Sequence, residues 1–160
     1  MSKPELPADF PRTSTRDRHA LGGRLQAWLA RTLGPGSEPH ISELRSPGGA
    51  GLSSETLLFD VSWQAGGREQ TGSYVARLHP TPDSMPVFPV YDFDRQVRAM
   101  RLVAERTAVP VPSVPWHEPD PAPLGSPFFI MNRIDGLVPP DIQGGSPRDA
   151  DRRHTNERTH

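Results

Sequence analysis

Apolar residues recur every three or four positions in two stretches of the chain, and this spacing predicts two helices. The first helix is expected over Leu21–Leu33, directly before Gly34-Pro35, a pair that stops helices. The second is expected over Asp92–Glu105 and must end before Val109-Pro110, because a residue that precedes proline avoids the α-helical region. Each helix has one apolar face, so we expect both to pack against another layer of the protein.

Apolar and polar residues alternate in several shorter runs, a period that predicts strands. Three runs, over His40–Leu44, Thr56–Trp63 and Ser73–His79, are expected to form an antiparallel meander. A proline-rich stretch over residues 110–127 permits at most a short edge strand, and Phe128–Ile134 is expected to be a buried strand. The predicted fold is therefore α+β, with a five-stranded antiparallel sheet covered by helices.

The two ends of the chain differ from its middle. Residues 1–16 have no apolar period, and we interpret them as a mobile arm. Residues 17–142 form the predicted folded lobe. In residues 143–160 nearly every apolar side chain is lost, so this tail cannot form a core. We interpret the tail either as the result of a truncation or reading-frame change near Gln143, or as an authentic disordered tail.

Composition excludes several classes of function. The chain carries 18 basic and 19 acidic residues, a net charge of −1, so no global field favours nucleic acid or an anionic membrane. Cysteine is absent, which excludes disulfides, thiolate nucleophiles and iron–sulfur clusters. The only lysine is Lys3, which excludes P-loop and Schiff-base chemistry in the folded region. With no signal-peptide pattern and no membrane-spanning run, we expect a cytoplasmic protein without nucleic-acid or membrane partners.

A glycine-rich segment lies between the first two predicted strands. Gly48, Gly49 and Gly51 leave backbone N–H groups open to a ligand, and the hydroxyls of Ser53 and Ser54 can add to them. Groups of this kind can cradle phosphate oxygens. The alternative is an ordinary flexible hairpin turn.

One cation stands on a later predicted strand. Arg77 lies among apolar neighbours, and its guanidinium could hold phosphates by a bidentate contact. The alternative is a solvent-facing arginine on a half-exposed strand. The second predicted helix would have to supply an acidic partner, but Gln96 is the residue expected to point inward there. Asp92 and Asp94 are interpreted as acids that favour the N-terminus of this helix.

The last predicted strand turns polar at its end, in the segment Pro127–Gly136. An adenine ring needs an apolar slot with a backbone N–H and C=O along one edge, and a strand that leaves a core offers this pair. The alternative is a plain core strand followed by a turn.

Four segments in this order resemble the aminoglycoside phosphotransferase and choline-kinase-like superfamily, whose fold is protein-kinase-like. They are Gly48–Thr56, Val75–Leu78, Arg95–Pro112 with its V-P-V-P ending, and Phe128–Gly136. The resemblance covers roughly residues 18–142 and is strongest to the kinase-like domain that is fused to some acyl-CoA dehydrogenases.

The resemblance implies an N-terminal lobe that binds ATP or GTP with Mg²⁺. The glycines would lie over the phosphates, Arg77 would contact them, and Met131 to Ile134 would form the hinge. Gln96 falls near the glutamate that the family carries on its helix, and this departure removes the carboxylate of the family's ion pair. The candidate nucleotide-binding residues are Gly48, Gly49, Gly51, Ser53, Ser54, Arg77, Gln96, Met131, Asn132 and Ile134.

In this family the catalytic H-G-D-x-x-x-x-N stretch and a later metal-binding aspartate lie in a C-terminal lobe, and this sequence has neither. We therefore expect no catalytic residues, no metal ligands and no activity of the chain alone. Without a second lobe, Phe128 and Phe129 are expected to be short of packing partners and to promote association.

The predicted function is that of the nucleotide-binding lobe of an ATP-dependent small-molecule phosphotransferase, truncated before the catalytic lobe. The alternative is a non-catalytic protein-interaction module derived from a kinase-like lobe. Such a module would contact a protein partner through residues 110–127 and through the surface that the missing lobe leaves exposed.

Overall fold

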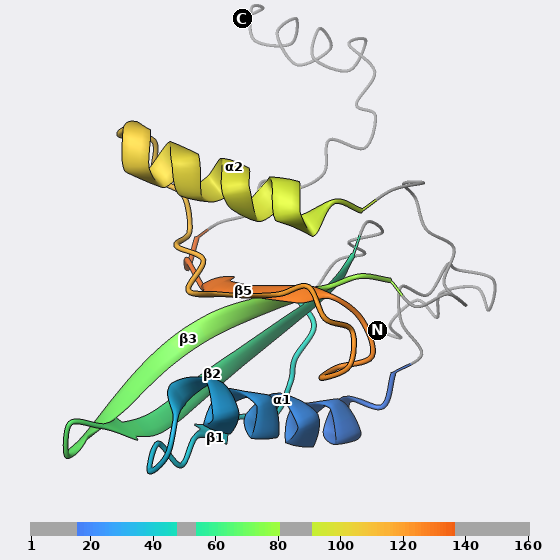
Figure 1. The fold of residues 1–160 in the computed structure, drawn as a ribbon, viewed down its shortest axis with the longest axis vertical. Coiled ribbons are helices and arrows are strands. Elements are labelled where there is room, and N and C mark those ends of the chain that lie inside the picture. The colour runs from blue at the N-terminus through green and yellow to red at the C-terminus, as the bar shows by residue number, and fades with distance from the viewer. Residues whose placement is uncertain (1–15, 48–53, 81–90, 137–160) are drawn as a thin grey trace, which may run out of the picture.

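The computed structural model describes residues 16–47, 54–80 and 91–136, and these ranges contain two helices and a five-stranded antiparallel sheet (Figure 1). In chain order the elements are α1 (Arg18–Leu33), β1 (His40–Ile41), β2 (Glu55–Ala65), β3 (Arg68–Leu78), α2 (Phe93–Arg106), β4 (Trp116–Glu118) and β5 (Phe128–Asn132). The predicted α+β fold, a five-stranded antiparallel sheet covered by helices, is confirmed. α1 begins directly after Asp17, because the side chain of Asp17 accepts a hydrogen bond from the backbone N–H of His19 and caps the helix.

The strands are ordered β1-β2-β3-β5-β4, and every neighbouring pair is antiparallel. β2 and β3 form one long hairpin that ends at Gly66 and Gly67, whose φ angles are 58° and 74°. A two-residue turn of this kind needs positive φ at both positions, which glycine adopts without strain from a Cβ. The turn fixes the register in which Arg77 lies opposite Thr56.

β1 is shorter than the predicted strand over His40–Leu44. The backbone N–H of Asp60 donates to the hydroxyl of Ser42, at 2.9 Å, where a continuous ladder would use a backbone carbonyl. A side chain that takes over a ladder hydrogen bond interrupts the strand. Pairing resumes as an isolated bridge between Arg45 and Leu58.

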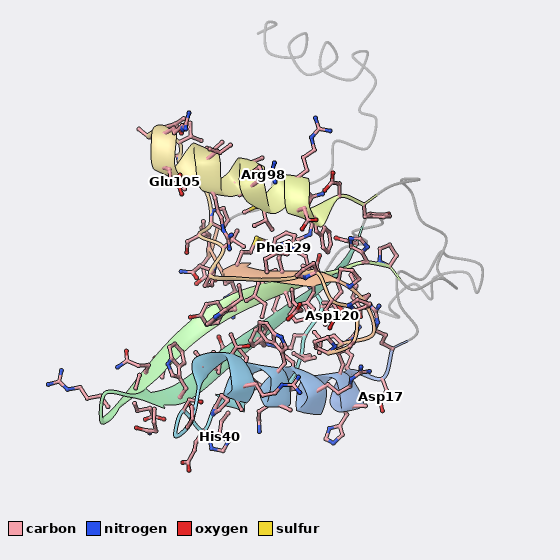
Figure 2. The ribbon with its side chains drawn as sticks, viewed as in Figure 1. Asp17, His40, Arg98, Glu105, Asp120 and Phe129 are labelled. Atoms are coloured by element: carbon pink, nitrogen blue, oxygen red, sulfur yellow. The ribbon has the colours of Figure 1, made fainter. Side chains whose placement is uncertain are left out.

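The two helices cover opposite faces of the sheet (Figure 1). Successive side chains of a strand point to opposite faces. Phe128 of β5 accordingly packs in the core on the α1 face, and Phe129, labelled in Figure 2, packs on the α2 face. The buried core on the α1 face is the larger: it consists of Leu21, Leu25, Trp28, Leu29, Leu44, Leu57, Phe59, Val61, Ala76, Leu78, Leu124, Phe128 and Ile130. The core on the α2 face consists of Phe93, Val97, Val114 and Phe129, with Met100 and Met131 packed against it.

The expectation that Phe128 and Phe129 lack packing partners is wrong. Both side chains are 0% exposed. The ring of Phe128 meets Trp28 of α1 edge-on at a centroid distance of 4.9 Å, and the ring of Phe129 meets Phe93 of α2 at 4.9 Å. Because one helix covers each face of β5, the side chains of Phe128 and Phe129 are both buried within the described residues.

The predicted arm and tail fall almost wholly outside the described residues, which begin at Arg16 and end at Gly136. Arg16, the last residue of the predicted arm, donates hydrogen bonds to His79 and Ser126 in the folded part of the chain. Neither of the two described helices is long and apolar enough to cross a bilayer.

Candidate anion-binding site

The structure brings together two of the predicted site residues, Ser54 and Arg77. Ser54 directly precedes β2 and is 3% exposed. Its Oγ accepts hydrogen bonds from Nε and Nη2 of Arg77, at 3.0 and 2.6 Å. Arg77 is paired with Phe129 across β3 and β5, so its side chain leaves the sheet on the face that carries α2. The hairpin register thus places the cation beside the first described residue after the glycine segment.

The guanidinium of Arg77 is a half-buried charge with a neutral hydrogen-bond partner. Burial lowers the pKa of Arg77 from its ordinary value, because loss of water disfavours the charged form. None of the ion pairs among the described residues joins Arg77 to a carboxylate. A cation that has lost water without gaining a counter-ion is stabilised by an anion that binds beside it.

The contact with Ser54 also orients the guanidinium. Ser54 Oγ lies on the edge formed by Nε and Nη2. A guanidinium has a second edge, formed by Nη1 and Nη2, that can donate two parallel hydrogen bonds to one oxyanion. In the described part of the chain no hydrogen bond engages Nη1 of Arg77. The arrangement therefore leaves the Nη1 and Nη2 edge of Arg77 in a fixed orientation that can bind phosphate or carboxylate. We call this pair of donors the fork.

The prediction that Gln96 points inward is wrong, because this residue is exposed on α2. The buried stripe of α2 consists of Phe93 and Val97, flanked by the half-buried Met100. This stripe rests on β5 and is narrow, so the neighbouring helix position stays open to solvent. Within the residues that the structure describes, Ser54 and not α2 orients Arg77.

The predicted hinge residues lie farther along β5. Asn132 is paired with Tyr74, three residues from Arg77 on β3, a separation of about 10 Å along the strand. β5 ends at Asn132, before the predicted Ile134, and the backbone N–H of Asn132 donates to the carbonyl of Ser113. Met131 is half-buried, whereas Asn132 and Ile134 are exposed. Among the described residues, no hydrogen bond or ion pair joins a side chain of this segment to Arg77.

The remaining predicted residues, Gly48, Gly49, Gly51 and Ser53, lie outside the described residues.

A polar cluster around Arg16 includes the residue next to Ser54 in the sequence and contains none of the predicted site residues. The guanidinium of Arg16 forms an ion pair with Glu55, the residue after Ser54. It also donates to the backbone carbonyl of His79, at 3.2 Å, and to the hydroxyl of Ser126, at 2.8 Å. Arg16 and Ser126 are 110 positions apart. No local pattern of the sequence signals a contact over that distance.

A second polar cluster joins β2, β3 and the end of β5. Asp60 accepts hydrogen bonds from Ser73 at 2.6 Å and from Arg133 at 3.1 Å, and lies 3.3 Å from Arg45. The hydrogen bond from Ser73 lowers the pKa of the Asp60 carboxyl, and the charges of Arg133 and Arg45 lower it further. These groups satisfy one another, so we interpret the cluster as structural.

A cavity of about 250 Å³ lies at the start of α2, lined in part by His79, His117 and Asp94. His117 Nε2 lies 3.3 Å from a carboxylate oxygen of Asp94, without the geometry of a hydrogen bond. The ring of His79 packs edge-on against Phe93 at 4.3 Å. In the described part of the chain, no group of three or more His, Asp or Glu side chains could hold a metal ion.

His79 gives a pH-dependence that can be tested. Burial lowers the pKa of its imidazole, the charge of Arg16 lowers it further, and Asp94 opposes the shift. Because the pKa of His79 is lower in the folded protein than the ordinary value of 6.5, the neutral imidazole favours the folded state. This contribution to the free energy of unfolding is fully present above pH 6.5 and is lost as the pH falls through the folded-state pKa. We expect His79→Phe, which keeps a ring against Phe93, to lose less Tm than the wild type between pH 6.5 and about 5.

Thermal unfolding followed by circular dichroism at each pH makes this measurement, with the exposed His40→Gln as the control. A profile of His79→Phe that runs parallel to that of the wild type would contradict the prediction.

Comparison with known proteins gives partial similarities. No family model matches the chain. Over 90 residues the chain is 32% identical to the probable acyl-CoA dehydrogenase IBR3 of Arabidopsis thaliana, a match that covers 56% of this chain and 10% of that protein. A crystal structure of a proposed aminoglycoside phosphotransferase from Ralstonia eutropha is 24% identical, with a TM-score of 0.45, and the match covers 72% of this chain and 28% of that one. The chain thus spans a small part of the length of both proteins.

Proposed function

We propose that the chain binds the phosphate groups of a nucleotide at Arg77 and serves as the nucleotide-binding lobe of a small-molecule phosphotransferase. The observation that carries this proposal is the half-buried guanidinium of Arg77, which has a neutral partner in Ser54 and a fork of donors left for an anion. Arginine binds phosphate bidentately through such a fork. Ser54 lies three residues after Gly51, the last glycine of the glycine-rich segment, whose backbone N–H groups would add to the same anion.

The sheet offers an apolar surface for the base next to this fork. Val75 lies two residues before Arg77 on the same face of β3, about 7 Å along the strand. Its cross-strand partners are Leu58 on β2 and Met131 on β5. The three side chains form an apolar patch across three strands, in which Val75 is buried and Leu58 and Met131 are half-buried. We propose that an adenine or guanine ring packs against the half-buried side chains of this patch. The predicted choice between ATP and GTP stays open.

The described residues do not fit a Mg²⁺ site. Mg²⁺ takes oxygen ligands, chiefly carboxylates, and no group of three or more His, Asp or Glu side chains in the described ranges could hold a metal ion. We therefore assign to this lobe the binding and orientation of the nucleotide. We propose that a catalytic base and metal ligands, which phosphoryl transfer requires, come from outside these residues.

The alternative, a protein-interaction module that uses residues 110–127, has less support. Val114 and Leu124 of this stretch are buried, and the guanidinium of Arg24 donates to the carbonyls of Pro123 and Ala122. The stretch therefore packs against α1 and the sheet, and much of it is not available as a docking surface.

Calorimetric titration of the full chain with ATP, GTP and inorganic tripolyphosphate tests the proposed function. Loss of a charge-assisted hydrogen bond costs about 1.5–3 kcal/mol, so we expect Arg77→Ala to bind ATP roughly 10- to 100-fold more weakly than the wild type. Arg98→Ala, which removes an exposed arginine of α2, is the matched control and should bind as the wild type does. Equal affinity of the Arg77→Ala and Arg98→Ala variants would refute a phosphate site at Arg77.

A further inference from the structure

The side chain of Arg16 connects the segment before α1 to three other segments of the chain near the candidate site. It stands one residue before the cap of α1, and its guanidinium reaches Glu55 at the start of β2, the carbonyl of His79 after β3, and Ser126 before β5. The side chain of Arg16 is 12% exposed and that of Glu55 is 6% exposed. A guanidinium with five donors can make these contacts at the same time, whereas an ammonium group cannot match their planar geometry.

Two of the residues that Arg16 contacts, Glu55 and His79, are close in sequence to Ser54 and Arg77 respectively. Glu55 directly follows Ser54, which accepts the hydrogen bonds of Arg77. His79 lies two residues after Arg77, just beyond the end of β3. Backbone pairing of the hairpin begins at Glu55, so Ser54 lies outside the ladder. The position of the Ser54 hydroxyl therefore depends on how firmly Glu55 is held, and Arg16 is the group that holds its carboxylate.

We infer that Arg16 is a positioning residue for the anion site: by clamping Glu55 and His79 it keeps Ser54 Oγ on one edge of Arg77 and leaves the other edge free for phosphate. The nature of the anion rests on the proposed function. The coupling of Arg16 to the contact between Ser54 and Arg77 is a property of the chain without ligand. The chain segment that precedes the first helix thus sets the geometry of a site on the opposite face of the sheet.

Three substitutions separate this role from general stabilisation. Arg16→Gln removes the charge and the fork. Arg24→Gln is the matched control, because Arg24 of α1 also ties the N-terminal part of the chain to a distant loop through two carbonyls, Pro123 at 2.8 Å and Ala122 at 3.0 Å, but has no contact with Glu55. Arg16→Lys keeps the charge without the fork and should behave as Arg16→Gln does.

The first readout needs no ligand. In NMR spectra of the full chain, the Nε–H group of Arg77, identified by its disappearance in Arg77→Lys, should exchange slowly with water because it donates to Ser54. We expect its exchange to become at least about tenfold faster in Arg16→Gln and to stay as in the wild type in Arg24→Gln. The backbone N–H groups of β5 report stability in the same spectra. Unchanged exchange at Arg77 in Arg16→Gln, or acceleration only in proportion to β5, would overturn the inference.

The second readout is affinity for tripolyphosphate and ATP. We expect Arg16→Gln to bind about five- to tenfold more weakly than the wild type, and Arg24→Gln to bind within about twofold of it. If the wild type binds neither ligand, the proposed function fails, while the exchange of the Arg77 Nε–H still decides the role of Arg16. If the wild type binds and Arg16→Gln binds equally well, the inference fails and the proposed function stands.

Discussion

Phe128→Ala is expected to lower the free energy of unfolding by about 3–5 kcal/mol, the cost of truncating a fully buried phenylalanine. The ring lies in the core between α1 and the sheet, edge-on to Trp28. On the strands beside it, its partners are Leu78 of β3 and Glu118 of β4. Removal of the ring opens a cavity that α1 and two strands border, and such walls collapse only in part. Because whole domains are stable by only about 5–15 kcal/mol, this single change removes a large share of the total.

Urea unfolding followed by circular dichroism measures this effect. Leu102→Ala is the control, because Leu102 of α2 is 41% exposed and its truncation should change the free energy of unfolding by less than about 0.5 kcal/mol. If Phe128→Ala lowered the free energy of unfolding no more than Leu102→Ala does, the result would contradict the packing of α1 against β5 described above.

Glu55→Ala is expected to destabilise the protein by a similar amount, about 3–5 kcal/mol, for an electrostatic reason. Glu55 is the carboxylate that Arg16 contacts, and both side chains are largely buried. Without Glu55, the largely buried guanidinium loses the carboxylate with which it is paired, while its hydrogen bonds to His79 and Ser126 remain. The expected loss therefore reflects the removal of a counter-charge from a buried cation more than the loss of one hydrogen bond.

A double variant distinguishes these two causes. Replacement of both partners of a buried ion pair by apolar residues is often neutral, so Arg16→Met combined with Glu55→Leu should recover at least about half of the stability that Glu55→Ala loses. The same urea titrations measure it. A double variant as unstable as Glu55→Ala would indicate that the hydrogen bonds of Arg16, and not its charge, dominate at this position.

The secondary structure of this protein followed from its sequence because it depends on neighbours along the chain. The period of apolar residues located both helices, and alternation located the strands of the hairpin. The early end of β1 arises where the side chain of Ser42 takes the place of a backbone partner, which no period reveals.

The candidate site followed from the sequence in part. Ser54 and Arg77 were named from separate patterns, and their contact required the register that Gly66 and Gly67 set. Gln96 was misplaced because helical spacing gives the direction of a side chain but not the width of the surface that covers it.

By itself, the sequence determined the α+β architecture, the order of the elements and the cation on β3, since these rest on local periodicity and residue type. Only the tertiary structure decided that Phe128 and Phe129 are both buried, that a serine orients Arg77, and that Arg16 holds Glu55, His79 and Ser126 together. The physical reason is that these contacts join residues far apart in sequence. Their free energies depend on how the two helices close over the two faces of one sheet.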